Sequence, residues 1–123
     1  MGVRGIRGAI TVEQDRKEEV VAATKELLEE MVQRNDVQPD DIASILITTT
    51  EDVKSTFPAQ AARLLEGWQY VPLMCAREIP VPGSLPSCIR VMMHVNSEKS
   101  ADQINHVFLR EAIKLRPDLV NRD

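Results

Sequence analysis

The segment from residue 16 to residue 34 constrains the fold most, because its apolar residues recur at the spacing of an amphipathic helix. The apolar set is Val20, Val21, Thr24, Leu27, Leu28, Met31 and Val32. Asp15 and Glu18 have the spacing of a capping box and predict where the helix begins. The opposite face is rich in lysine and glutamate, which indicates a solvated surface. A helix of this kind has to bury its apolar face against another layer.

Short runs of β-branched and apolar residues supply that second layer. Strands are predicted at residues 3–12, 42–50, 71–79 and 89–95. Gly5 and Gly8 lie inside the first run, where we interpret them as kinks. Phe57 and Pro58 precede a second, short helix, which Gly67 closes in the left-handed conformation.

The last segment, residues 102–115, is ambiguous. Its apolar spacing fits a helix, whereas residues 106–109 (HVFL) suit a strand, and periodicity leaves both open. The order of the elements predicts an α+β domain with one mixed sheet and its helices on one face. Since two helices leave part of such a sheet uncovered, we expect a closed homo-oligomer.

Length and charge exclude several classes of protein. A chain of 123 residues predicts a single domain, residues 1–123, and a net charge of -4 argues against binding to nucleic acid or to an anionic membrane. Two cysteines and two histidines match no zinc spacing and no disulfide framework, so we expect no metal and a reduced, cytoplasmic setting. No apolar run is long enough for a signal peptide or a membrane span.

Arginines are the candidates for chemistry, because the motifs of nucleotide-binding proteins, zinc proteases, α/β-hydrolases and redox proteins are absent. Arg90 lies in an apolar strand, where a cation needs a partner. That partner is either Glu78, in a structural ion pair, or a bound anion. For Arg7 the alternatives are a similar anion site and a charge on an edge strand.

Several other residues have an ordinary structural interpretation. Cys75 is more typical of a small buried residue than of a nucleophile. Phe57 is typical of a hydrophobic staple. His94 and His106 are more typical of structural or exposed residues than of ligands. Arg63 has the character of a solvated surface charge.

Four separated segments nevertheless carry one family pattern. They are RGIRGA (residues 4–9), GWQYVP (67–72), CIRVMM (88–93) and LRPDL (115–119). Together they resemble the monofunctional chorismate mutases of the trimeric, barrel-like class, over residues 3–119. The resemblance implies an α/β-barrel-like fold with a five-stranded sheet, two main helices, and sheets packed around a trimer axis. It also implies that residues 106–109 form a strand.

The resemblance further implies the reaction, which is the rearrangement of chorismate to prephenate without a cofactor, a step in aromatic amino acid biosynthesis. Active sites would lie between subunits of a homotrimer. Arg7 and Arg90 would hold the carboxylates and the ether oxygen of the substrate, and Glu78 and Cys75 would meet its ring hydroxyl. The other implied substrate contacts are Phe57, Ala59 and Arg63 from the neighbouring subunit, with Met74, Phe108, and the mobile tail from about residue 115, including Leu115 and Arg116.

Two positions depart from the family pattern. Phe108 stands where relatives commonly have a tyrosine, and Gln60 stands where a lysine is frequent. Two other functions remain open at this point: a trimeric enamine or imine deaminase, which also holds a carboxylate with arginines, and a non-catalytic trimer that binds a carboxylated ligand.

Overall fold

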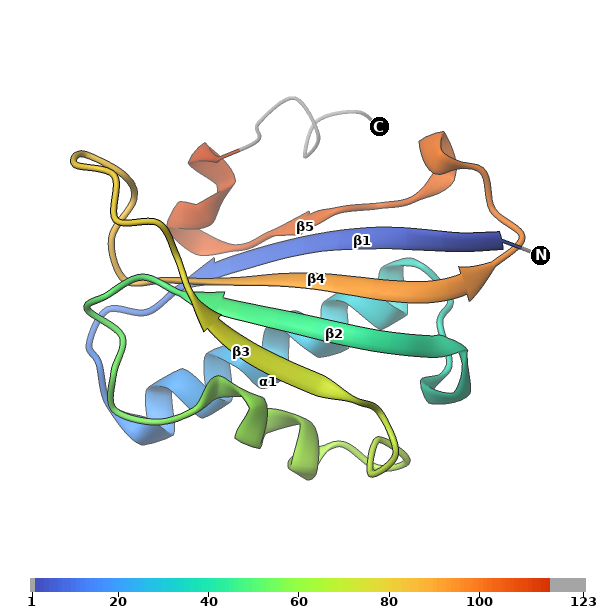
Figure 1. Ribbon diagram of the computed structural model, residues 1–123, viewed down its shortest axis with the longest axis horizontal. Helices are drawn as coiled ribbons and strands as arrows, with labels where there is room; N and C mark the ends of the chain where they lie inside the picture. Colours follow the sequence, from blue (N-terminus) through green and yellow to red (C-terminus); the bar gives the residue numbers. More distant parts are fainter. Residues whose placement is uncertain (1, 116–123) are drawn as a thin grey trace.

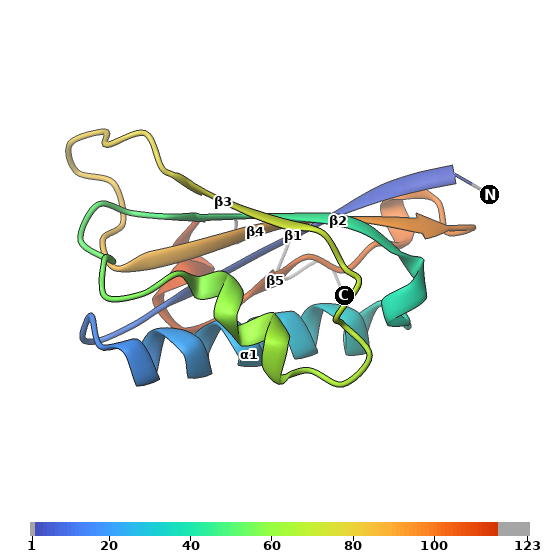
Figure 2. The ribbon, with the colours of Figure 1, turned by 60° about the horizontal axis from the view of Figure 1, so that its bottom comes forward.

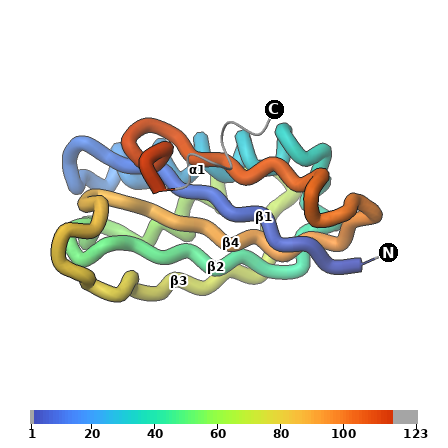
Figure 3. Tube along the Cα trace, turned by 90° about the horizontal axis from the view of Figure 1, so that it is seen from above, coloured from blue at the N-terminus to red at the C-terminus, as the bar shows by residue number. Residues whose placement is uncertain are grey.

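The computed structural model describes residues 2–115, which form a mixed five-stranded sheet in the order β3-β2-β4-β1-β5 (Figure 1). The strands are β1 Gly2–Thr11, β2 Ile42–Thr49, β3 Leu73–Arg77, β4 Cys88–Ser97 and β5 Val107–Phe108. The central β4 is antiparallel to β1 and β2, while the edge strands β3 and β5 are parallel to β2 and β1, respectively. Seen from above, the segment that follows β4 returns along β1 (Figure 3).

Helices α1 (Lys17–Arg34) and η2 (Pro58–Leu64) lie together on one side of the sheet (Figure 2). The shorter helical turns are η1 Pro39–Asp41, η3 Ala101–Gln103 and η4 Arg110–Lys114. This arrangement confirms the predicted mixed sheet with two main helices. Among residues 2–115, no helix is long and apolar enough to cross a membrane.

The two faces of the sheet differ sharply in exposure. On the face toward α1, alternate residues such as Ile6, Ile47 and Met93 are completely buried in the core, where the apolar stripe of α1 covers them. On the other face, Leu46 is 38% exposed and Met74 is 70% exposed. We call this second face, which also carries Arg7 and Arg90, the open face.

The interpretation of Gly8 as a kink is wrong, because β1 runs unbroken through it. Gly8 is needed for close packing instead: a Cβ atom there would collide with Met31 of α1 and approach Leu27 Cδ1 to 3.1 Å. The expected left-handed conformation of Gly67 is confirmed by its φ of 87°. Each glycine therefore serves a different purpose, contact in one case and backbone conformation in the other.

The predicted capping box of Asp15 and Glu18 is also wrong. Helix α1 begins after Arg16, and no side chain caps it. The Asp15 carboxylate accepts hydrogen bonds from the amides of Lys54 (3.0 Å) and Ser55 (3.1 Å), so it is already engaged by the loop before η2. Partial burial alone would raise the pKa of Asp15, but the side chain of Ser55 and these two amides together outweigh it, and the pKa lies below its ordinary value.

The ambiguous segment 102–115 contains both kinds of structure. The strand implied by the family resemblance is confirmed, although β5 has only two residues, Val107–Phe108. The helical spacing predicted for the same segment is realised in the short turn η4 that follows.

Candidate active site

Strand pairing places the candidate residues in one row across the open face. Arg90 on β4 pairs directly with Thr48 on β2 and with Ala9 on β1, and Ala9 pairs with Phe108 on β5. Directly paired residues point to the same face of a sheet, and so does Arg7, two residues before Ala9. Three strands therefore bring Arg7, Arg90 and Phe108 together.

A pocket of about 400 Å³ opens over this row. We call it the arginine pocket, and its lining includes Arg7, Thr48, Glu78, Arg90, Phe108 and Leu115. A volume of this size suits a small ligand, and two guanidinium groups in its wall favour a ligand that carries negative charge.

Glu78 and Arg90 are close enough to form an ion pair. Arg90 Nε lies 3.9 Å from Glu78 Oε2, and the Thr48 hydroxyl donates a hydrogen bond to the same carboxylate. Glu78 follows the end of β3, but its amide still donates to the carbonyl of Thr49 at 2.9 Å, which extends the pairing with β2. The pair is open to solvent, with the side chains of Arg90 and Glu78 40% and 25% exposed. Glu78, one of the two partners expected for Arg90, is therefore present in the pocket lining, and the partly exposed guanidinium remains accessible to an anionic ligand.

Arg7 is held from two sides. Its guanidinium carbon lies 5.9 Å from the centre of the Phe108 ring, within range of a cation–π interaction. Its backbone amide donates to His106 Nδ1 at 2.9 Å. The interpretation of Arg7 as a charge on an edge strand is wrong, because β1 lies between β4 and β5.

Cys88 lies two residues before Arg90 on β4, outside the lining of the arginine pocket. It is buried in a small cluster with Ala9, Phe108 and Ala112. Burial raises the pKa of the Cys88 thiol, against the neighbouring Arg90 charge, which lowers it. A neutral thiol therefore lies next to the Arg90 side chain, and the anionic form is disfavoured.

A second pocket, of about 450 Å³, lies beside η2 and β3. We call it the Phe57 pocket, and its lining includes Phe57, Ala59, Gln60, Arg63, Leu73 and Cys75. Phe57 is 71% exposed, so its interpretation as a hydrophobic staple is wrong. Cys75 is half-buried and packs against the core under the sheet, in agreement with its interpretation as a small buried residue.

The two pockets divide the predicted site residues within one protomer. Cys75 pairs with Ile47 and shares its face of the sheet, whereas Glu78 lies in the arginine pocket with Thr48. The two residues expected to contact the ring hydroxyl of the substrate therefore do not lie together within one protomer. Met74 is exposed on the open face, outside the lining of both pockets. Arg116 lies outside the described residues.

Sequence reasoning missed Thr48 and His106 as contributors to the site. Thr48 belongs to a predicted strand, but its position next to Glu78 depends on strand register, which no local pattern reveals. His106 was expected to be structural or exposed, and its partner in the structure is the backbone amide of Arg7, which no local pattern indicates. No cluster of three or more metal-ligating side chains occurs between residues 2 and 115.

Comparison with known proteins identifies the family. The family model described as chorismate mutase type I matches residues 3–119. The chain is 50% identical to the chorismate mutase AroH of Bacillus subtilis over 119 residues, covering 97% of this chain and 94% of that protein. It is 53% identical to the chorismate mutase AroH of Thermus thermophilus over 118 residues, covering 95% and 96% of the two chains.

A solved structure agrees with these matches. A chorismate mutase from Clostridium thermocellum superimposes with a TM-score of 0.85 at 52% identity, over 88% of this chain and 96% of that one. The comparisons give no support to the deaminase or to the non-catalytic trimer. Together with the arginines and Glu78 on the open face, they show that this chain belongs to the type I chorismate mutase family.

Proposed function

We propose that this protein is an enzyme that converts chorismate to prephenate by an intramolecular rearrangement, and that the arginine pocket holds the reacting atoms. The observation that carries this proposal is the placement of Arg90, Glu78 and Arg7 around one pocket on the open face, in a chain of the chorismate mutase family. The reaction moves electrons within one substrate molecule, so it uses no cofactor.

Arg90 is proposed to act on the breaking bond. As the carbon–oxygen bond of the substrate breaks, negative charge grows on the ether oxygen and the ring becomes positive. A fixed cation at that oxygen stabilises the transition state more than the ground state, which is the condition for acceleration. Glu78 holds Arg90 from one side, and its own negative charge favours the positive ring.

Arg7 and the residues near it are proposed to bind the substrate. The Arg7 guanidinium presents a rigid fork that suits a carboxylate of chorismate. Phe108 lies under this guanidinium and Leu115 lines the same pocket, so both restrict where the substrate can lie. Fixing the flexible substrate in its folded, reactive form also removes part of the conformational barrier.

The complete site is proposed to form between protomers of a homotrimer. The arginine pocket is open, and exposed apolar side chains such as Phe57 and Met74 lie at the surface of the isolated chain. We place Phe57, Ala59 and Arg63 of one protomer against the arginine pocket of the next. Cys75 lines the same pocket as these residues, so we assign it to that neighbouring wall. Arg116, which lies outside the described residues, is proposed to bind the substrate as well.

The direct test is to incubate the purified protein with chorismate and to follow the loss of its ultraviolet absorbance together with the formation of prephenate. We expect conversion without any added metal or cofactor. No proton moves in the rearrangement, and an arginine stays protonated throughout the accessible range, so kcat should be nearly flat from about pH 6 to pH 8. Absence of prephenate, or a bell-shaped profile with a large solvent deuterium effect on the chemical step, would contradict the proposal.

A further inference from the structure

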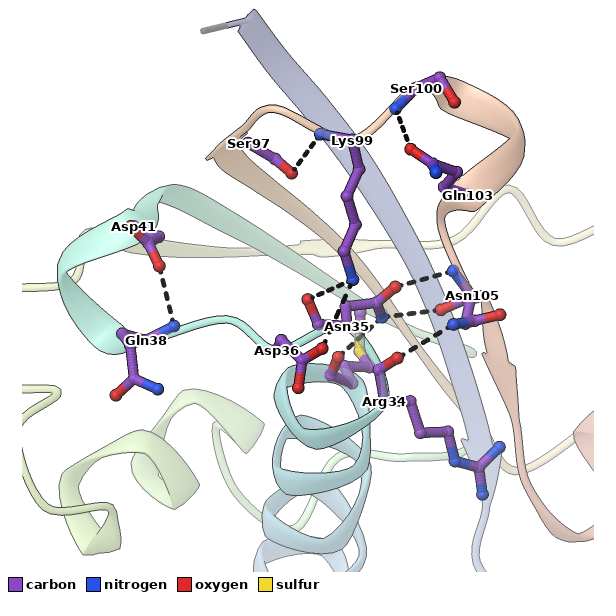
Figure 4. Close-up of polar contacts among 11 residues, drawn as sticks. Arg34, Asn35, Asp36, Gln38, Asp41, Ser97, Lys99, Ser100, Gln103 and Asn105 are labelled. Carbon is purple, nitrogen blue, oxygen red and sulfur yellow. Dashed lines mark hydrogen bonds and ion pairs between the residues drawn. The ribbon is translucent and has the colours of Figure 1, made fainter.

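Asn35 is the one buried amide side chain at the C-terminal end of α1 within the described residues, and its side chain makes three hydrogen bonds to backbone atoms (Figure 4). Its side-chain nitrogen donates to the carbonyls of Met31 and Asn105, both at 2.8 Å. Its side-chain oxygen accepts the amide of Asn105 at 2.7 Å. The residue is only 3% exposed. Because the reversed amide would satisfy none of these three bonds, its orientation is fixed.

The pair of hydrogen bonds between the Asn35 side chain and the Asn105 backbone lies where the pairing of β1 with β5 ends. The parallel ladder consists of two pairs, Gly8 with Val107 and Ala9 with Phe108. Two residues before Val107, the backbone amide and carbonyl of Asn105 form hydrogen bonds with the Asn35 side chain instead of with β1. The Asn35 side chain, at the C-terminal end of α1, therefore supplies to Asn105 the hydrogen bonds that a longer β1–β5 ladder would otherwise supply.

On β1, a backbone amide likewise bonds to a side chain instead of to the backbone of β5. The amide of Arg7 donates to the ring nitrogen Nδ1 of His106, the residue directly after Asn105. The other end of β5 is fixed by the amide of Leu109, which donates to the carbonyl of Ala9 at 2.9 Å. Since a two-residue strand has few bonds of its own, its place depends on what holds each end.

These bonds lead from α1 to the arginine pocket. Asn35 fixes Asn105, the next residue accepts the amide of Arg7, and Phe108 two residues further on lies under the Arg7 guanidinium at 5.9 Å. Two further contacts at this corner involve other atoms. Lys99 Nζ donates to the Asn35 carbonyl at 2.9 Å, and the Asn105 side chain donates to the carbonyl of Arg34 at 3.0 Å (Figure 4).

We propose that Asn35 is a positioning residue for the mutase site, which acts by holding β5 so that His106 and Phe108 fix the backbone and the guanidinium of Arg7. The proposal rests on the role given to Arg7 and Phe108 under the proposed function. Asn35 touches no substrate atom. Its contribution is geometric, because displacement of a binding group on the order of 1 Å can lower a rate by about 10²-fold.

The test compares Asn35→Ser and Asn35→Asp with a matched control, Asn105→Ala. Both Asn35 variants lose the two donated bonds, and the aspartate also turns a charge toward two carbonyls. The control removes only the exposed bond from the Asn105 side chain and keeps the backbone pair. We expect kcat/KM to fall by about tenfold or more in the Asn35 variants, mainly through KM, and to stay within about twofold in the control.

Two measurements read the position of β5 without turnover. The amide of Leu109 should exchange hydrogen faster in the Asn35 variants, while the amide of Met93 in the middle of β4 should keep its protection. The 15N resonance of His106 Nδ1 should lose the signature of an accepted hydrogen bond. If neither Asn35 variant folds, His106→Ala removes the half-buried ring that accepts the Arg7 amide, and we expect the same rise in KM.

Two results would overturn the proposal. One is an unchanged KM and kcat in folded Asn35 variants. The other is equal acceleration of exchange at Leu109 and Met93, which would show that Asn35 supports only global stability. Failure of the wild-type protein to convert chorismate would instead contradict the proposed function. The hydrogen-exchange and resonance measurements would still show whether Asn35 holds β5 in place.

Discussion

Replacement of Arg90 by alanine separates the catalytic role from the structural one. Arg90 Nε lies 3.9 Å from Glu78, and both side chains remain partly exposed, at 40% and 25%. Solvent screens a pair of this kind, so its loss should cost at most about 1 kcal/mol of folding free energy, against roughly 3–5 kcal/mol for a fully buried pair. The Arg90→Ala protein should therefore melt only a few degrees below the wild type.

The same substitution should have a much larger effect on the reaction. If Arg90 stabilises the charge on the ether oxygen as a donor of an oxyanion hole does, its removal should lower kcat by about 10²- to 10³-fold, or roughly 3–4 kcal/mol. The assay is steady-state formation of prephenate, with thermal unfolding measured on the same samples. Arg34→Ala is the matched control, since it removes an equal charge from an exposed pair with Glu30 on α1 and should leave kcat unchanged.

A large drop in melting temperature with nearly normal kcat would refute this reasoning. That result would mean that Arg90 exists mainly to neutralise Glu78. A loss of activity in the Arg34→Ala control would show that overall charge, and not the position of Arg90, governs the rate.

Three further predictions concern binding, packing and acid stability. Phe108→Tyr adds a hydroxyl in the arginine pocket and should lower KM by an amount equivalent to about 0.5–1.5 kcal/mol; weaker binding in steady-state assays would contradict this. Gly8→Ala forces a Cβ atom against α1 and should cost about 1–3 kcal/mol in denaturant unfolding, whereas Gly2→Ala, where no described atom lies within 4 Å, should be neutral. The pKa of Asp52 is lowered, because hydrogen bonds from Thr50 and Ser87 outweigh the opposing effect of burial. The stabilisation from the Asp52 carboxylate is therefore present above the unfolded pKa near 3.9 and is lost as pH falls through the lower folded pKa. Asp52→Asn should lower the unfolding free energy more at pH 7 than at pH 2, and an equal loss at both pH values in denaturant unfolding would contradict this.

The sequence was informative where a local pattern determines the structure. Helical spacing over residues 16–34 predicted α1, which spans Lys17–Arg34, because one apolar stripe has to face the sheet. The need of Arg90 for an anionic partner was also predictable, because a cation in an apolar strand needs one, and Glu78 was one of the two candidates.

The remaining features depend on contacts between distant segments. Asp15 has the spacing of a helix cap, yet it binds the amides of Lys54 and Ser55, which only the folded chain brings near. The strand β5 is too short for periodicity to distinguish it from a helix, and side chains such as Asn35 fix it from another element. By contrast, the separation of Cys75 from Glu78 was predictable from strand alternation alone, because residues three apart on a strand point to opposite faces.

The most direct test of the shared site mixes two inactive variants, Arg90→Ala and Arg63→Ala. If each site takes Arg90 from one protomer of a homotrimer and Arg63 from the next, every mixed trimer contains one site with both arginines intact. Mixed trimers, purified by two different tags after co-refolding, should therefore recover about one third of the wild-type rate of prephenate formation. No recovery in verified mixed trimers would place Arg90 and Arg63 on the same wall and would contradict a site formed between protomers.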